Sequence, residues 1–277
     1  MSGERQRPPV IGPISRAEEF AAAFNVSRET ISRLATYETL LRQWQKAVNL
    51  VAPSTLDEIW HRHFADSAQL LPLAAAARTW VDLGSGAGFP GLIIAILLAD
   101  SPSPHSSSEW GEGRGEGQQH TPEQAAAPHP NPLPAEERGE GTRAEPTPPR
   151  ITLIESNARK CAFLREVVRQ TGIGACVSVD ILSTRIETAA TQASLQAPDV
   201  VSARALAPLD KLLGLAAALF TPVTVGLFLK GRDVAAELEA AKKAWNFNAD
   251  LVPSRTDSDG RIVVVRNLEP KSEGMNP

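Results

Sequence analysis

The sequence is poor in cysteine and lacks the long apolar runs of membrane proteins. Its two cysteines, Cys161 and Cys176, form no CxxC pair, so they offer no zinc framework and favour a reducing compartment. No run of about 18 apolar residues is present, which argues against a membrane-spanning helix. The first residues, MSGERQRPPVIGP, lack the apolar core of a signal peptide. These absences predict a cytoplasmic protein with no membrane partner.

Aliphatic and aromatic residues are nearly missing from one internal segment, residues 101–149. The segment has no Ile, Val, Phe, Met, Tyr or Cys, and its only large apolar side chains are Trp110 and Leu133. It holds ten of the 22 prolines and six of the 19 glycines. Such a composition cannot bury enough surface to offset the entropy of ordering, so we expect a disordered insert. No strand precedes its glycines and no helix follows them, which argues against a phosphate-binding loop.

The charge of the chain is also uneven. The net formal charge is −4, but residues 101–149 contain eight acids and three bases and so carry −5. The remainder is therefore close to neutral at +1, which permits a local basic face for an anionic partner.

The rest of the chain alternates helical and strand patterns. Residues 27–50 have the spacing of an amphipathic helix with Ser27 as N-cap, and Thr55 to Glu58 form a capping box for a second helix. From Thr79 onward, short apolar strands alternate with helices and end in a hairpin with Asp259-Gly260 near its turn. This order predicts a doubly wound, Rossmann-like α/β sheet with a terminal antiparallel hairpin and a small N-terminal helical region. The expected organisation is a flexible N-terminus (1–26), a helical region (27–78), a main domain (79–268) interrupted at 101–149, and a flexible tail (269–277).

The stretch VDLGSGAGFPG follows the first strand and contains two overlapping motifs. Gly86 to Gly91 match GxGxxG, the dinucleotide fingerprint, which is weak evidence when alone. Asp82, Gly84, Gly86 and Gly88 match the D/E-x-G-x-G-x-G loop that is typical of S-adenosylmethionine (SAM)-dependent methyltransferases. An acid at the strand end attracts the cationic methionine part of SAM and repels a pyrophosphate, so Asp82 favours the methyltransferase pattern.

A second acid supports this interpretation. An acid at the end of the next strand, about 20 residues on, is expected to bind the ribose hydroxyls. Glu155 ends the strand ITLIE but lies 71 residues after Gly84; without the 49 residues of the insert, the separation is 22. Composition and spacing therefore point to the same interruption.

With these residues identified, the chain resembles the bacterial 16S rRNA guanine-N7 methyltransferase family (RsmG/GidB). The resemblance covers roughly residues 27–100 and 151–268 and rests on ordered blocks: WQKAVNLVAPS, RHFADS, VDLGSGAGFPG, LIESNARKCAFLREV, RIET, VSARALAPL and FLKG. It implies SAM as cofactor and rRNA, within the small ribosomal subunit or a precursor, as substrate. It also implies cofactor contacts at Gly84, Phe89, Ile186, Glu187 and Arg204. The insert is the departure from the family pattern.

Guanine N7 has a free lone pair, so its methylation needs alignment and exclusion of water but no general base. The candidates for contact with the reacting groups are Arg204 and Lys230, at the ends of neighbouring strands. We expect no metal, because His61 and His63 are two positions apart on a helix and face different ways. His63, Asp66 and Ser67 instead either pack, tie the helical region to the glycine loop, or contact RNA.

The basic residues and the GxGxxG match each admit a further interpretation. Basic residues on two predicted helices could contact phosphate or form an ordinary solvated face: Arg28, Arg33, Arg42, Lys46, Arg159, Lys160 and Arg165. A nicotinamide-dependent oxidoreductase would use the GxGxxG match, and a non-catalytic rRNA-binding factor would keep the SAM pocket without turnover. We expect a monomeric SAM-dependent rRNA methyltransferase.

Overall fold

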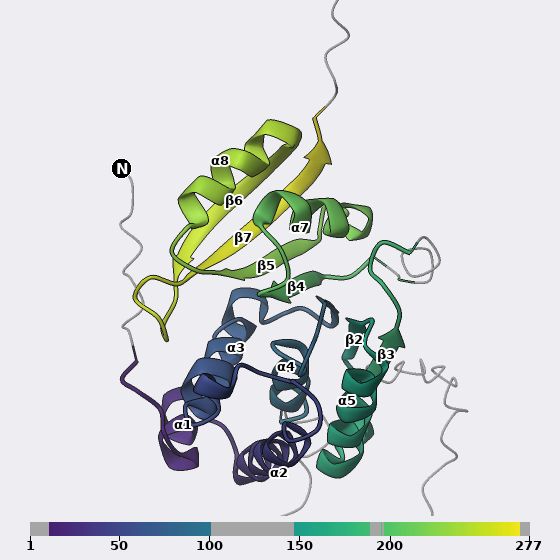
Figure 1. The fold of residues 1–277 in the computed structure, drawn as a ribbon. Coiled ribbons are helices and arrows are strands. Elements are labelled where there is room, and N and C mark those ends of the chain that lie inside the picture. The colour runs from purple at the N-terminus through teal and green to yellow at the C-terminus, as the bar shows by residue number, and fades with distance from the viewer. Residues whose placement is uncertain (1–10, 101–146, 189–194, 196, 272–277) are drawn as a thin grey trace, which may run out of the picture. The chain divides into compact units, whose positions relative to one another are not determined.

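The computed structural model describes residues 11–100, 147–188, 195 and 197–271. These residues contain a seven-stranded sheet of order β3-β2-β1-β4-β5-β7-β6 (Figure 1). Neighbouring strands from β3 to β5 are parallel, and β7 is antiparallel to both β5 and β6. The strands are β1 (Thr79–Leu83), β2 (Arg150–Glu155), β3 (Ser178–Ser183), β4 (Val200–Arg204), β5 (Val225–Lys230), β6 (Trp245–Pro253) and β7 (Arg261–Pro270). The predicted doubly wound sheet and terminal hairpin are confirmed.

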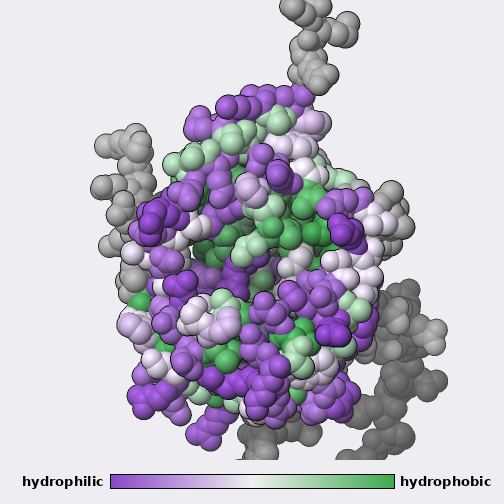
Figure 2. Space-filling model, viewed as in Figure 1, coloured by the Kyte–Doolittle hydropathy of each residue, from purple (hydrophilic) through white to green (hydrophobic). Residues whose placement is uncertain are grey.

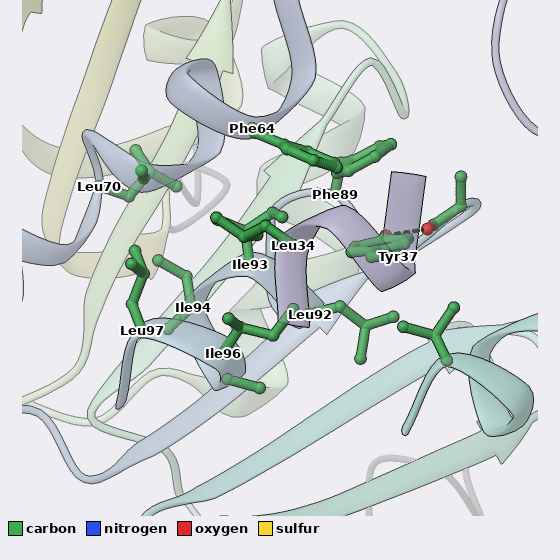
Figure 3. Close-up of a cluster of buried hydrophobic side chains, with 14 of the residues drawn as sticks. Leu34, Tyr37, Phe64, Leu70, Phe89, Leu92, Ile93, Ile94, Ile96 and Leu97 are labelled. Atoms are coloured by element: carbon green, nitrogen blue, oxygen red, sulfur yellow. Dashed lines mark hydrogen bonds between the residues drawn. The ribbon is translucent and has the colours of Figure 1, made fainter. Parts of the chain in front are cut away.

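Each face of the sheet carries its own hydrophobic core. Helices α2 (Arg28–Trp44), α4 (Gly91–Leu98) and α5 (Ala158–Thr171) contribute to one core. Helices α7 (Leu209–Ala216) and α8 (Val234–Ala244) contribute to the other. All eight residues of α4 are buried, because this helix packs between the sheet and the N-terminal helices (Figure 3). That burial explains why its sequence, GLIIAILL, has no polar face.

The N-terminal helical region begins with α1 (Ala17–Phe24), which precedes α2. Ser27 caps α2 as predicted, because its side chain accepts a hydrogen bond from the Thr30 N–H. The helix ends at Trp44, six residues before the predicted end at Leu50. The Gln45 side chain accepts from the N–H groups of Leu50 and Val51 and donates to the Val51 carbonyl. These bonds stabilise a non-helical return of the chain, which the apolar spacing does not show.

The predicted capping box at Thr55 is wrong. The Thr55 hydroxyl donates to the Ala52 carbonyl and contacts His63 Nε2, so it does not cap a helix that begins there. The segment instead forms a series of short elements: the 3₁₀ turn η1 (Pro53–Thr55), the π-helix η2 (Trp60–Ala65), α3 (Asp66–Ala68) and the 3₁₀ turn η3 (Leu71–Ala74). π-helical turns are rare in proteins, but those that occur are often found at functional sites.

The expected flexible ends differ from the described structure in two places. Ala17–Phe24 is helical, and Phe20 is fully buried against Trp60, so this part of the N-terminus is packed. Residues 269 and 270 belong to β7. The predicted disordered insert, 101–149, also extends too far, because Pro149 is buried and its carbonyl accepts from the Ser178 N–H. The other predictions of flexibility, for residues 1–10, 272–277 and residues 101–146 of the insert, lie outside the described residues. The remaining elements are the 3₁₀ turns η4 (Ile173–Ala175) and η5 (Ala217–Leu219).

Candidate active site

The glycine motif forms the turn between β1 and α4. Gly84, Gly86 and Gly88 have φ values of +63°, +57° and +97°, in the left-handed region that favours glycine. A Cβ on Gly84 would lie 2.5 Å from Leu206 Cδ1, so the loop after β4 packs directly on this backbone. The turn therefore presents bare backbone at the carboxyl edge of the sheet, where ligands bind in such folds.

Tyr37, the single tyrosine of the chain, holds this turn from the N-terminal region. Its hydroxyl donates to the carbonyl of Ala87, and its ring stacks on Phe89 with 5.5 Å between centroids (Figure 3). Complete burial raises the pKa of Tyr37 well above its usual value, so the hydroxyl stays a donor. Sequence reasoning missed this residue, whose only signal is its place on the apolar face of α2.

Asp82 lies behind the glycine turn. Its carboxylate is fully buried, accepting from the Ser202 hydroxyl at 2.9 Å and facing the Gly91 N–H at 3.3 Å. Burial raises the pKa of Asp82 to about 6, against the opposing effect of these hydrogen bonds. Asp82 therefore joins β1 to β4 and to the first residue of α4, and it does not line the cavity in front of the turn.

Glu155 ends β2 and meets the glycine turn across the strand pair. One carboxylate oxygen accepts from the Gly86 N–H at 2.9 Å and the other from the Asn157 N–H at 2.7 Å. The parallel register of β1 and β2 places Glu155 just beyond the partner of Leu83. The structure thus brings together two residues that the insert separates in sequence.

A cavity of about 680 Å³ opens in front of Gly84, Gly86 and Glu155. Figure 2 shows this face of the molecule hollowed near its centre, with hydrophobic residues above the hollow and hydrophilic residues below. Ile186 and Glu187, from the loop after β3, line the cavity together with Phe89 and Arg204. The predicted cofactor residues therefore face one cavity, except for Asp82 and Gly88, which lie behind the turn.

Arg204, at the end of β4, joins this cavity to the π-helix η2. Its Nη1 donates to the Arg62 carbonyl at 2.8 Å and pairs with Asp66 at 3.3 Å. Its guanidinium lies over the Phe89 ring, 4.9 Å from the centroid, on which the His63 ring also stacks. The arrangement ties the helical region to the cofactor turn, which is one of the roles expected for His63 and Asp66. Ser67 instead donates to the His63 carbonyl, four residues earlier in the same helical segment.

The contacts of His63 fix its tautomer. Arg204 Nη2 lies 2.7 Å from Nδ1, and a guanidinium only donates, so Nδ1 accepts. The neutral ring then carries its proton on Nε2 and donates to Thr55 Oγ1 at 2.8 Å, which donates to the Ala52 carbonyl. Burial, and then the charges of Arg204 and Arg62, lower the pKa of His63 to about 3. At neutral pH this imidazole is uncharged and both its nitrogens are engaged.

We expect a pH dependence of stability from His63. Its folded pKa of about 3 lies below the ordinary 6.5, so the unfolded chain binds the extra proton, and stability is lost as pH falls from 6.5 towards 3. Over the whole range the shift corresponds to at most about 5 kcal/mol. Urea unfolding of wild type and His63→Gln at pH 5 and pH 7.5 measures it. The wild type should lose more stability at pH 5 than the variant, and equal losses would contradict the assignment. Asp82 acts in the opposite direction between pH 4 and 6 but is common to both proteins.

Lys230 does not line the cavity in front of the glycine turn, which Arg204 does line. Its ammonium donates to the Ala207 carbonyl at 2.6 Å and pairs with Glu237 at 2.7 Å. It lines a second cavity of about 420 Å³, which adjoins the first and shares Asp66, Arg204 and Asp257 with it. Glu237 also accepts from the Leu209 N–H, so the pair fixes the loop between β4 and α7.

Of the seven basic residues considered for phosphate contacts, Lys160 lines the main cavity in the described part of the chain. Among the described residues, no three histidine, cysteine or acidic side chains converge in a way that could hold a metal ion.

No described helix combines the length and apolar character needed to cross a bilayer.

Comparison with known proteins gives a family match on both sides of the insert. The model of the GidB family, described as rRNA small subunit methyltransferase G, matches residues 30–102 and 145–260. A ribosomal RNA small subunit methyltransferase G from Parvibaculum lavamentivorans is 45% identical over 253 residues, which cover 91% of this chain and 89% of that protein. The protein of the same name from Methylobacterium radiotolerans is 46% identical over 91% of this chain and 95% of its own. Among solved structures, a methyltransferase from Geobacter sulfurreducens aligns with 92% of this chain and 98% of its own at 10% identity and a TM-score of 0.45.

Proposed function

The chain belongs to the GidB family, rRNA small subunit methyltransferase G, and from this membership we infer that it is a SAM-dependent methyltransferase that acts on 16S rRNA. We propose further that the methylated atom is N7 of a guanine. The observation that carries the SAM-dependent activity is the bare glycine turn, held by Glu155 at the carboxyl edge of the sheet, in front of a cavity.

The residues around this cavity fit SAM. Its volume lies within the range of about 300 to 1,000 Å³ that is usual for small-molecule sites. The turn leaves no room for a Cβ at Gly84, and each Glu155 oxygen keeps a second lone pair for a ribose hydroxyl. We therefore propose cofactor contacts from the turn, Glu155 and the loop after β3. The proposed contact residues are Gly84, Gly86, Phe89, Glu155, Ile186 and Glu187.

The other candidate residues are proposed to act by positioning these contact residues and the loops that carry them. Asp82 and Gly88 shape the turn from behind, because both are packed against its inner side. Arg204 sets the position of Phe89 and borders both cavities, so it can also contact the cofactor or the target base. Lys230 fixes the β4–α7 loop beside the second cavity.

The chemistry of guanine N7 matches the state of these side chains. SAM, when bound, supplies the electrophilic methyl group. N7 carries a lone pair and no proton, so the protein has no proton to remove. His63 has both ring nitrogens bonded, and Asp66 accepts from Arg204, Gln69 and Thr256. The task left to the protein is to align the base and to exclude water.

Methyl transfer from labelled SAM to small subunits from a strain that lacks the enzyme tests this function. We expect label in 16S rRNA, at one guanine, in a form that is sensitive to chemical cleavage at N7-methylguanine. Folded protein that binds SAM and labels no small-subunit rRNA would overturn the proposed substrate.

The same preparation should sediment as a monomer, and fractionated cells should hold the protein in the cytoplasm with its substrate. A stable dimer or a membrane-bound pool would contradict these two points.

We also propose that residues 101–149 interrupt a single domain. The family match leaves out residues 103–144. Asp100 accepts from the Ser27 N–H at 3.0 Å, beyond α4, and Arg150 pairs with Thr79, the first residue of β1. Both ends of the insert therefore lie at the amino edge of the sheet, away from the cavity.

Replacing residues 101–146 with a short glycine–serine linker should leave SAM affinity within about twofold of wild type, because loop length changes stability only logarithmically. Calorimetric titration of both proteins with SAM measures this. A folded deletion variant with more than tenfold weaker binding would show that the insert contributes to the site.

A further inference from the structure

The second cavity, beside the proposed SAM site, has an acid that no other described residue neutralises. Two acids line both cavities, Asp66 and Asp257. Asp66 is bonded to Arg204, Gln69 and Thr256. Asp257, in the loop between β6 and β7, accepts at one oxygen from the Asp259 N–H at 2.9 Å. Within the described part of the chain, its other oxygen has no hydrogen-bond donor and the carboxylate forms no ion pair.

The loop that carries Asp257 is fixed from both sides. The Asp257 N–H donates to Ser254 Oγ at 3.2 Å, and its carbonyl accepts from the Gly260 N–H at 3.1 Å. Ser254 is buried and is bonded in turn to Gln69 of the helical region. The Asp257 carboxylate oxygen that has no donor is therefore held in a fixed position at the boundary of the two cavities. Recognition of a base requires such a fixed geometry.

The geometry of guanine gives this acid a partner. Enzymes that modify a base commonly hold it out of the stack and read its Watson–Crick edge with hydrogen bonds, while apolar side chains cover its faces. N7 lies on the opposite edge from N1 and the 2-amino group, so a base whose N7 points into the main cavity directs these two donors into the second one. Leu206 and Pro208 line the second cavity and offer the apolar cover.

We propose that the second cavity holds the target guanine and that Asp257 determines specificity by accepting hydrogen bonds from N1–H and the 2-amino group. This inference rests on the proposed function. Adenine presents a lone pair at N1 and no 2-amino group, so the same carboxylate repels it. Hypoxanthine keeps N1–H and loses the 2-amino group, so it should be a poorer substrate by about tenfold, the usual cost of one such contact.

The test uses small subunits reconstituted with 16S rRNA that is ligated from a synthetic oligonucleotide, with guanosine or inosine at the mapped target. Methyl transfer is measured for wild type, Asp257→Asn and Asp257→Glu, and SAM binding is measured for each protein to show that it is folded. Asp259→Asn is the matched control, because its side chain pairs with exposed Arg232 and lines neither cavity.

The wild type and Asp259→Asn should prefer guanosine by about tenfold in kcat/KM. Asp257→Asn should lose about 10- to 100-fold on guanosine and show nearly equal rates on both substrates. Asp257→Glu, which keeps the carboxylate, should retain the preference at a lower rate. Equal wild-type rates on guanosine and inosine would overturn the inference, and so would a slower Asp257→Asn that keeps the full preference. A wild type that binds SAM and methylates neither substrate would instead overturn the proposed function, and the inference with it.

Discussion

Replacing Glu155 with glutamine should weaken SAM binding by about 100-fold, the largest loss we expect from a single isosteric change. Both carboxylate oxygens accept from backbone N–H groups, those of Gly86 and Asn157. A glutamine amide must turn its NH₂ group towards one of these donors, so a partly buried N–H loses its partner, at a cost of about 1–3 kcal/mol. The same change removes the negative charge that we propose for the ribose hydroxyls, and charge-assisted hydrogen bonds are the stronger ones.

Calorimetric titration with SAM, well below the unfolding temperature of both proteins, measures the effect. The matched control is Glu166→Gln on α5, a partly exposed acid that pairs with Arg169 on its own helix and does not line the cavity. That variant should bind SAM like wild type, because surface ion pairs contribute little. If Glu155→Gln keeps SAM affinity within threefold of wild type, the carboxylate does not hold the ribose and the cofactor lies elsewhere in the cavity.

The second large effect is expected at Arg204. Arg204→Lys should lower methyl transfer about 100-fold, although the positive charge is kept. The guanidinium contacts the Arg62 carbonyl, Asp66 and His63 and also covers the Phe89 ring. An ammonium on a flexible stem cannot reproduce this planar fork. Asp66, whose side chain is 19% exposed, then loses its guanidinium partner, and the π-helix separates from the glycine turn.

Single-turnover methyl transfer and thermal unfolding, measured side by side, separate the two consequences. We expect the melting temperature to fall as well, since a partly buried pair is broken. Arg232→Lys is the control, because Arg232 is exposed and pairs with Asp259 at the surface. A transfer rate of Arg204→Lys close to that of wild type would show that charge alone is needed at this position.

Much of the fold could be predicted from the sequence, because its signals are local. Strands such as ITLIE and VVSAR are short apolar runs, and Ser27 marks the start of α2 as its N-cap. The expectation failed where a side chain replaces helical hydrogen bonds. The Gln45 side chain ends α2 early, and the Thr55 hydroxyl bonds to the Ala52 carbonyl and does not cap a helix. Neither contact can be recognised from the spacing of apolar residues.

The same distinction holds for the candidate site, in which some positions could be predicted from the sequence and others could not. Glu155 could be placed beside the glycine turn because strand pairing is regular and the insert could be recognised by composition. The partners of Arg204 and Lys230 could not be placed. The only signal for Tyr37 was its place on the apolar face of α2, and the position of Asp257 gave no signal. Arg204 meets residues 138 to 142 positions away, and Thr256 meets Asp66 across 190 positions.

The sequence by itself determined the class of sheet, the glycine turn, the acid that faces it and the interruption between them. These follow from backbone preferences and from periodic burial, which act over a few residues. Only the tertiary structure decided that Asp82 supports the turn from behind, that His63 is held neutral by Arg204, and that Asp257 stays open between two cavities. Each of these depends on which distant groups reach a side chain once the helical region and the hairpin pack onto the same edge of the sheet.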